Sequence, residues 1–196
     1  MKKLLLTLGI LVLFALSASA QIPTPFSFYA GGALSVPSSP EGFSDGWKTG
    51  YHGMAGVGYK MSPKFQLVGK LEYHNFSADV SNYPDLDGGN AKIMMYGVDG
   101  RFSLGLPMTP IKPFFFGGGG IAHVEWDEFT GTNLITSILN SYLPEAENKF
   151  YYNAGAGVEF AFGPTMNFFV QGRYVSVATE GEKMSYIPIT LGLKFF

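Results

Sequence analysis

Most of the chain alternates between apolar and polar residues with a period of two. In residues 149–162, one parity is apolar from Phe150 to Phe162, whereas the other carries Asn153, Glu159 and small residues. Because successive side chains of a strand point to opposite faces of a sheet, this pattern predicts strands with one apolar and one polar face. Eight such segments occur, at 26–36, 48–60, 64–76, 92–105, 112–126, 149–162, 166–179 and 185–196.

The connections between these segments alternate in length and character. The turns "MSP", "LPMTPI" and "GPT" are short and contain proline, whereas the other four connections are mostly longer and more acidic. Successive turns of an up-and-down sheet lie at opposite ends, so short turns and long loops should occupy opposite rims. The alternating segments predict an all-β fold, and their even number fits eight antiparallel strands that close into an up-and-down barrel; the aromatic residues indicate that this is a transmembrane β-barrel.

Aromatic residues assigned to the apolar parity should form two belts. One belt, near the short-turn rim, comprises Phe26, Phe28, Tyr59, Phe65, Phe102, Phe114, Phe116, Phe160, Phe162, Phe168 and Phe195. The other, near the long-loop rim, comprises Tyr51, Tyr73, Tyr96, Trp126, Phe150, Tyr152 and Tyr174. An outward apolar band between two aromatic girdles is typical of a membrane barrel. A soluble lipocalin-like carrier of an apolar ligand, the alternative, needs apolar side chains inside instead.

The composition fits a membrane barrel and limits its chemistry. Aromatic residues make up 16% of the chain and charged residues only 14%, against about 25% charged residues in a typical soluble domain. After the first twenty residues, no apolar run is long enough for a membrane-spanning helix. The chain contains no cysteine, which excludes disulfides and thiol chemistry.

The first twenty residues differ from the rest of the chain. Lys2 and Lys3 form a positive start, an apolar stretch covers 4–16, and Ala18 and Ala20 are small residues before a cleavage point. This order of features predicts a secretory signal peptide at 1–20. The barrel domain would then comprise residues 21–196.

From "PFSFYAGGAL" to "ITLGLKFF" the mature chain resembles the small eight-stranded outer-membrane barrels of the OmpA/OmpX type found in Gram-negative envelopes. The resemblance implies an integral outer-membrane protein, expected to be a monomer, that is surrounded by lipid and has short periplasmic turns and external loops. It also implies that the barrel-assembly machinery recognises the last strand. The residues that match this signal are Leu191, Leu193, Phe195 and Phe196, with Phe195 on the outward parity.

The polar parity should fill the barrel interior. The predicted inward residues are Lys70, Glu72, His74, Asp99, Arg101, His123, Glu125, Asn153, Glu159, Gln171 and Arg173. Eight strands leave a lumen just wide enough for side chains, and unpaired buried charge is costly, so these residues should form a network that plugs the barrel. Lys70 and Glu72 should meet Asp99 and Arg101, because their strands are neighbours.

Three patterns suggest chemistry only weakly, and no catalytic residue, metal or cofactor is expected. His123 and Glu125 share a face, but no third metal ligand has a suitable spacing. A lipid A deacylase, the enzymatic alternative, uses a serine activated by a histidine, and no serine lies two residues after Glu125. Asp85, Asp87 and Asn90 lack the spacing of a calcium loop, so their Asp-Gly-Gly sequence favours a simple turn.

The longest loop contains a segment with helical periodicity. Leu134, Ile138 and Tyr142 recur at helical spacing and Pro144 ends the run, which predicts a short amphipathic helix across the barrel mouth or on the membrane interface.

Acidic residues gather in and beside the long loops. They are Glu41, Asp45, Asp79, Asp85, Asp87, Asp127, Glu128, Glu145, Glu147, Glu180 and Glu182. An acidic outer face disfavours nucleic acid and heparin as partners. The expected role is therefore non-enzymatic: envelope stability, adhesion or surface recognition by loops on a rigid scaffold.

Overall fold

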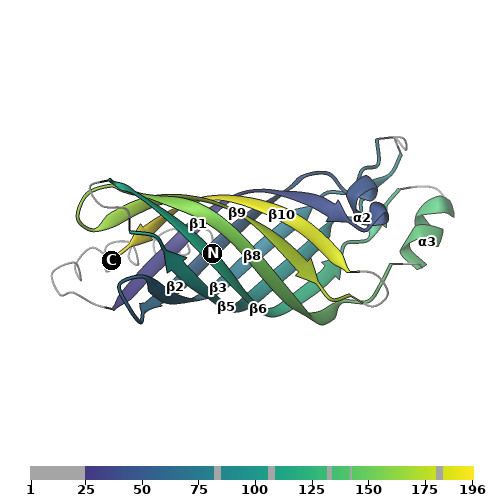
Figure 1. The fold of residues 1–196 in the computed structure, drawn as a ribbon. Coiled ribbons are helices and arrows are strands. Elements are labelled where there is room, and N and C mark those ends of the chain that lie inside the picture. Colours follow the sequence, from purple (N-terminus) through teal and green to yellow (C-terminus); the bar gives the residue numbers. More distant parts are fainter. Residues whose placement is uncertain (1–24, 82–84, 106–108, 132–133, 142, 180–182) are drawn as a thin grey trace, which may run out of the picture.

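Eight antiparallel strands close into a barrel in the computed structural model (Figure 1). They are β1 (Phe26–Ser39), β2 (Gly50–Lys60), β3 (Phe65–Phe76), β5 (Ala91–Ser103), β6 (Ile111–Trp126), β8 (Glu147–Ala161), β9 (Met166–Val177) and β10 (Met184–Phe195). The structure describes residues 25–81, 85–105, 109–131, 134–141, 143–179 and 183–196. The predicted eight-stranded barrel is confirmed, whereas the predicted signal peptide lies outside the described residues.

The barrel closes where the first strand meets the last. β1 pairs with β10 in an antiparallel register that sets Phe28 opposite Phe195 and Gly31 opposite Gly192. In each of the other seven pairings, the two barrel strands follow one another along the chain. Closure leaves no sheet edge with unpaired N–H and C=O groups, which is the condition for placing strands in hydrocarbon.

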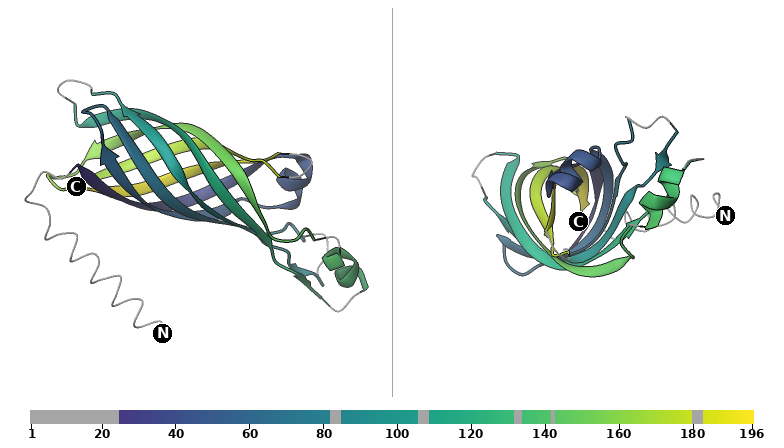
Figure 2. Two further views of the ribbon diagram at one scale, coloured as in Figure 1. Left: turned by 90° about the horizontal axis from the view of Figure 1, so that it is seen from below. Right: turned by 90° about the vertical axis from the view of Figure 1, so that its right-hand side faces the viewer.

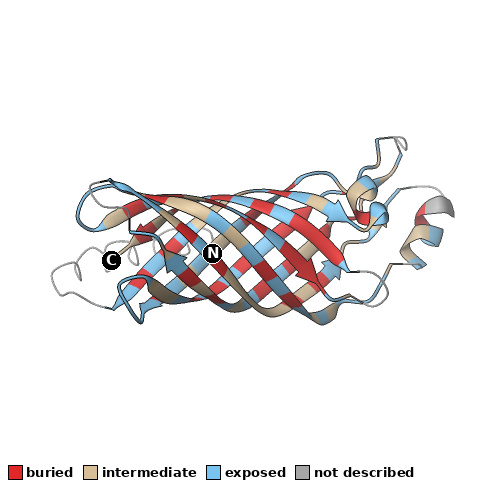
Figure 3. Ribbon diagram, in the orientation of Figure 1, coloured by how far each residue is buried: buried red, intermediate tan, exposed pale blue. Residues whose placement is uncertain are grey.

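Exposure alternates along the strands as the sequence predicted for β5 and β8 (Figure 3). On β5, Tyr96 and Val98 are about half exposed, whereas Asp99 and Arg101 are buried. On β8, Tyr152 is exposed and the neighbouring Tyr151 is fully buried. The outer surface of these strands is therefore apolar and their charged side chains face the lumen, whereas a lipocalin has a polar outer surface.

Strand β6 has the opposite parity from the one predicted. Phe114 and Phe116 point inward and are 1% and 8% exposed, whereas Phe115 is 55% exposed on the outside. Trp126, also placed in an outward belt, is only partly exposed and packs against a buried apolar cluster. The prediction was wrong here because three consecutive phenylalanines precede four consecutive glycines. A run without alternation does not show which side chains point to the lipid and which point to the lumen.

The long-loop end of the barrel carries the helices. Helix α2 (Glu41–Gly46) was not predicted; it lies over the barrel end and buries Phe43. The predicted helix is present as α3 (Leu134–Ser141), but it projects beyond the rim to one side instead of crossing the mouth (Figure 2). A short ribbon joins β4 (Asp87–Gly88) to β7 (Phe129–Thr130). Within the described residues, neither helix combines the length and apolarity needed to traverse a bilayer.

An outward charge at mid-depth tests this orientation of the strands. Val98→Arg should lower the free energy of unfolding by about 2–4 kcal/mol, because the guanidinium would face hydrocarbon. Denaturant titration in lipid vesicles, followed by heat-modifiable gel migration, measures the loss. Glu41→Arg, on the exposed surface of α2, is the matched control and should leave stability unchanged. Equal stability of the two variants would contradict the assignment of Val98 to the lipid-facing side of β5.

Candidate functional site in the barrel lumen

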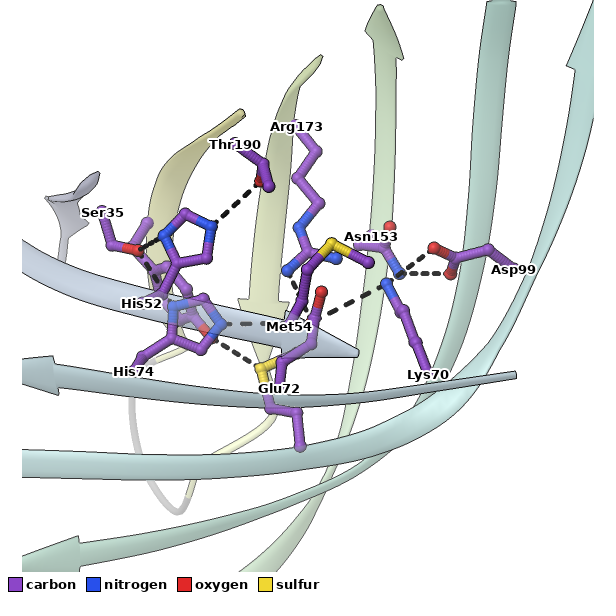
Figure 4. Close-up of polar contacts among 12 residues, drawn as sticks. Ser35, His52, Met54, Lys70, Glu72, His74, Asp99, Asn153, Arg173 and Thr190 are labelled. Atoms are coloured by element: carbon purple, nitrogen blue, oxygen red, sulfur yellow. Dashed lines mark hydrogen bonds and ion pairs between the residues drawn. The ribbon is translucent and has the colours of Figure 1, made fainter. Parts of the chain in front are cut away.

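Four charged side chains meet in the middle of the lumen (Figure 4). Lys70 Nζ lies 2.6 Å from Asp99 Oδ2 and 3.8 Å from Glu72 Oε2, and Arg173 Nη2 lies 2.5 Å from Glu72 Oε2. Asn153 Nδ2 donates a hydrogen bond of 2.9 Å to Asp99 Oδ1. These side chains come from β3, β5, β8 and β9, so the contacts cross the barrel as well as following its wall. Two cations face two carboxylates, and the central cluster is electrically balanced.

Small residues make room for this central cluster. A Cβ atom at Gly118 would collide with the Val98 carbonyl and with the Asp99 carboxylate, and one at Gly97 would collide with the hydroxyl of Tyr151. Gly97 on β5 and Gly118 on β6 therefore leave room inside the barrel for the Tyr151 and Asp99 side chains.

Two stacked histidines adjoin the charged cluster. The rings of His52 and His74 lie 5.0 Å apart with an interplanar angle of 20°. Ser35 Oγ lies 3.1 Å from His52 Nδ1 and 2.9 Å from His74 Nδ1, and His52 Nε2 lies 3.0 Å from Thr190 Oγ1. His74 Nε2 is 4.0 Å from Glu72 Oε2. The polar network thus continues from His74 on β3 through Ser35 on β1 and His52 on β2 to Thr190 on β10.

A second charged cluster lies nearer the short-turn end. Glu159 pairs with Arg101, accepts a hydrogen bond from Asn167, and lies 3.3 Å from Lys194 Nζ. The guanidinium of Arg101 also lies 3.5 Å from the ring centroid of Phe114, within cation–π range. One carboxylate here serves two cations, so this cluster carries excess positive charge.

Apolar side chains fill the lumen on either side of the central charges. The layer toward the long loops comprises Phe43, Phe76, Ala91, Ile93, Met95, Ala122, Val124, Tyr151, Val175, Val177, Met184 and Tyr186. The other layer comprises Tyr29, Val68, Phe114, Phe116 and Phe169. Ion pairs between such layers are shielded from water, so each charge depends on its partner.

The structure places most of the predicted lumen residues together. Lys70, Glu72, His74, Asp99, Arg101, Glu159 and Arg173 are all buried inside the barrel, and Gln171 reaches Met54. The predicted contact of Lys70 with Asp99 is present, but Arg101 pairs with Glu159 of β8, two strands away along the barrel wall.

Two predicted lumen residues lie outside the network. Glu125 is exposed, and His123 is half-buried with its Nδ1 atom 3.1 Å from Asn148 Oδ1. The inward positions at this level belong to Ala122 and Val124. Charges are tolerated on the outer face here because β6 ends at the long-loop rim, where side chains reach water instead of hydrocarbon.

Sequence reasoning missed five polar residues that take part in these contacts. They are Ser35, His52, Asn167, Thr190 and Lys194, and all five are buried. The signal was available, because His52 and Thr190 alternate with outward residues on their strands.

The barrel mouth at the long-loop end holds an aromatic cleft of about 570 Å³. Phe43, Trp47 and Trp126 line one part of it, and the two indole rings lie 5.0 Å apart. Glu145 and Glu147 line another part. Both tryptophans of the chain thus meet at one opening, beside two carboxylates.

Two further acidic residues, Asp79 and Asp87, lie in the connection between β3 and β5 and do not line the cleft. Hydrogen bonds from the hydroxyl and backbone N–H of Ser81, together with Lys48, lower the pKa of Asp79. In the Asp-Gly-Gly turn, Asp87 accepts a hydrogen bond from Gly88, as expected for a simple turn. Among the described residues, no three His, Asp or Glu side chains are placed to share a metal ion.

The predicted assembly-signal residues lie at the barrel seam. Leu191 and Leu193 pair with Gly32 and Ala30 of β1, and their strand keeps them on the outward parity with Phe195. Phe196 is exposed just beyond β10. Their recognition by the barrel-assembly machinery stays a prediction.

A family model for the outer membrane protein beta-barrel domain matches residues 7–195. The chain belongs to this family. Its place in the outer membrane follows from that membership and from the outward apolar face. No curated protein matches the sequence.

Solved barrels share the fold at low sequence identity. Neisserial surface protein A matches with a TM-score of 0.62 and 15% identity, over 88% of this chain and 97% of that one. A major outer membrane protein from Thermus thermophilus matches with a TM-score of 0.57 and 10% identity, over 87% and 97%. Ail from Yersinia pestis, bound to the heparin analogue sucrose octasulfate, matches with a TM-score of 0.50 and 17% identity, over 87% and 97%.

Breaking the central ion pairs tests the energetic role of the lumen. Glu72→Gln should lower the free energy of unfolding by about 3–5 kcal/mol, because Arg173 would keep a buried charge without its partner. Equilibrium unfolding in lipid vesicles measures the effect.

The double variant Glu72→Gln with Arg173→Met should recover part of that loss, since it removes both charges. Glu128→Gln, at an exposed loop position, is the control. Full stability of Glu72→Gln alone would show that the pair contributes nothing.

Proposed function

We propose that this protein is a non-enzymatic scaffold that braces the outer membrane and presents a recognition surface at its long-loop mouth. The filled lumen is the observation that carries the proposal. Balanced ion pairs occupy the centre, and apolar layers lie on both sides of it. Such an interior favours a rigid scaffold over a channel. Opening a channel would require the separation of paired charges in an environment of low dielectric constant.

The arrangement of nucleophiles argues against an enzymatic role. Ser35, His74 and Glu72 form a chain of contacts that resembles a triad, but all three residues are at most 1% exposed, so substrate has no access to the hydroxyl. His123, the histidine expected in a deacylase-like site, contacts Asn148 instead of a serine. A covalent mechanism needs an accessible nucleophile beside its base.

The long-loop mouth supports recognition of cationic groups. Tryptophan faces attract cations, and Glu145 adds negative charge beside them, whereas Glu147 is paired with Lys149. Although the Ail structure holds a heparin analogue, a polyanion would be repelled by the acidic mouth of this chain. The favoured partners are therefore basic peptides or protein surfaces.

A plugged lumen predicts the absence of a large conductance. The purified protein in planar bilayers should give no stable channel, because water and ions cannot pass the buried ion pairs and the apolar layers. Single-channel recording measures this, with a known porin as the positive control. A reproducible conductance that passes sugars would refute the scaffold proposal.

The two tryptophans provide a direct measurement of recognition at the mouth. Addition of oligolysine should change the intrinsic fluorescence saturably, whereas heparin should leave it unchanged. Glu145→Gln should weaken oligolysine binding about two- to fivefold, the range expected for one exposed ion pair.

Asp85→Asn is the matched control, since this exposed acid does not line the cleft. An equal loss in both variants would indicate general attraction to the acidic loops, and tighter binding of heparin would refute the assigned charge preference.

A further inference from the structure

The short-turn end of the barrel contains a cavity that the scaffold role does not use. Its volume is about 180 Å³, and it is lined by the ends of β1, β2, β6 and β10 and by the turn between β2 and β3. Four lysines line it: Lys60, Lys64, Lys112 and Lys194. Of the described lining residues, only Glu159 is acidic.

The positive charge of this cavity is not compensated. Glu159 already pairs with Arg101 and with Lys194, so its single negative charge is shared by two cations. In the described part of the chain, Lys60, Lys64 and Lys112 take part in no ion pair. Lys60, Lys64 and Lys112 are exposed at the rim of the cavity, where their charges attract anions from solution.

Neutral hydrogen-bond donors accompany the lysines. The Ser62 hydroxyl lines the cavity and accepts a hydrogen bond of 3.0 Å from the backbone N–H of Phe65, which leaves its own proton available to a bound oxygen. Ser103 lines the same space. Ammonium groups with adjacent hydroxyls match the charge and the several acceptor oxygens of a phosphate group.

We propose that this cavity binds one phosphate group at the periplasmic mouth of the barrel. The aromatic side chains of Phe26 and Phe65 also line the cavity, at the rim where outward aromatic residues meet lipid headgroups. Two sources supply the same chemistry at this level: the headgroup of an anionic phospholipid of the inner leaflet, and a free phosphate-bearing solute in the periplasm.

A titration with inorganic phosphate tests the site. Wild-type protein in dodecyl maltoside should bind one phosphate saturably by calorimetry, and Lys64→Gln with Lys112→Gln should weaken the affinity at least about tenfold. The matched control is Lys48→Gln with Lys183→Gln, which removes two cations at the opposite mouth. Equal affinity of the two double variants would overturn the site. Heat-modifiable migration establishes that each variant is folded.

Native mass spectrometry distinguishes the two sources. Retention of phosphatidylglycerol by the wild type and the control variant, but not by Lys64→Gln with Lys112→Gln, would assign a lipid headgroup. Diacylglycerol, which lacks the phosphate, should not be retained. Saturable inorganic phosphate binding without lipid retention would assign a free solute. If neither phosphate nor lipid binding differs between the two double variants, the proposal is wrong.

Discussion

The need to pair every backbone N–H and C=O group inside a bilayer controls this structure. Hydrocarbon offers no hydrogen bonds, so the sheet has to close, and here it closes through the pairing of β1 with β10. Closure assigns one parity of each strand to lipid and the other to a narrow lumen. The outward apolar residues and the inward charges are consequences of that single condition.

The same condition explains how the lumen is filled. Eight strands enclose too little space for bulk water, so an inward charge needs a partner on another strand. Glu72 meets Arg173, and Arg101 meets Glu159, over separations of 101 and 58 residues. The pair of Glu72 with Arg173 joins opposite walls of the barrel, and the pair of Arg101 with Glu159 spans the intervening strand β6. Both contacts hold the wall of the barrel in a fixed shape.

The two mouths of the barrel carry opposite charge. Tryptophans and carboxylates line the cleft at the long-loop end, whereas lysines and hydroxyls line the cavity at the short-turn end. The filled lumen separates them, so the binding proposed at one mouth would take place without a path to the other.

The sequence alone determined the number of strands, the alternation of short and long connections, and the facing of strands such as β5 and β8, because side-chain alternation has a strict period of two. It also identified most of the buried charges. It did not determine the facing of β6, where "FFFGGGG" has no alternation. It could not show that Phe43 closes one end of the lumen, nor that Arg101 pairs with Glu159. Those contacts depend on the stagger of the strands and on the tilt of the closed sheet, which bring distant residues to the same height, and only the tertiary structure fixes that height.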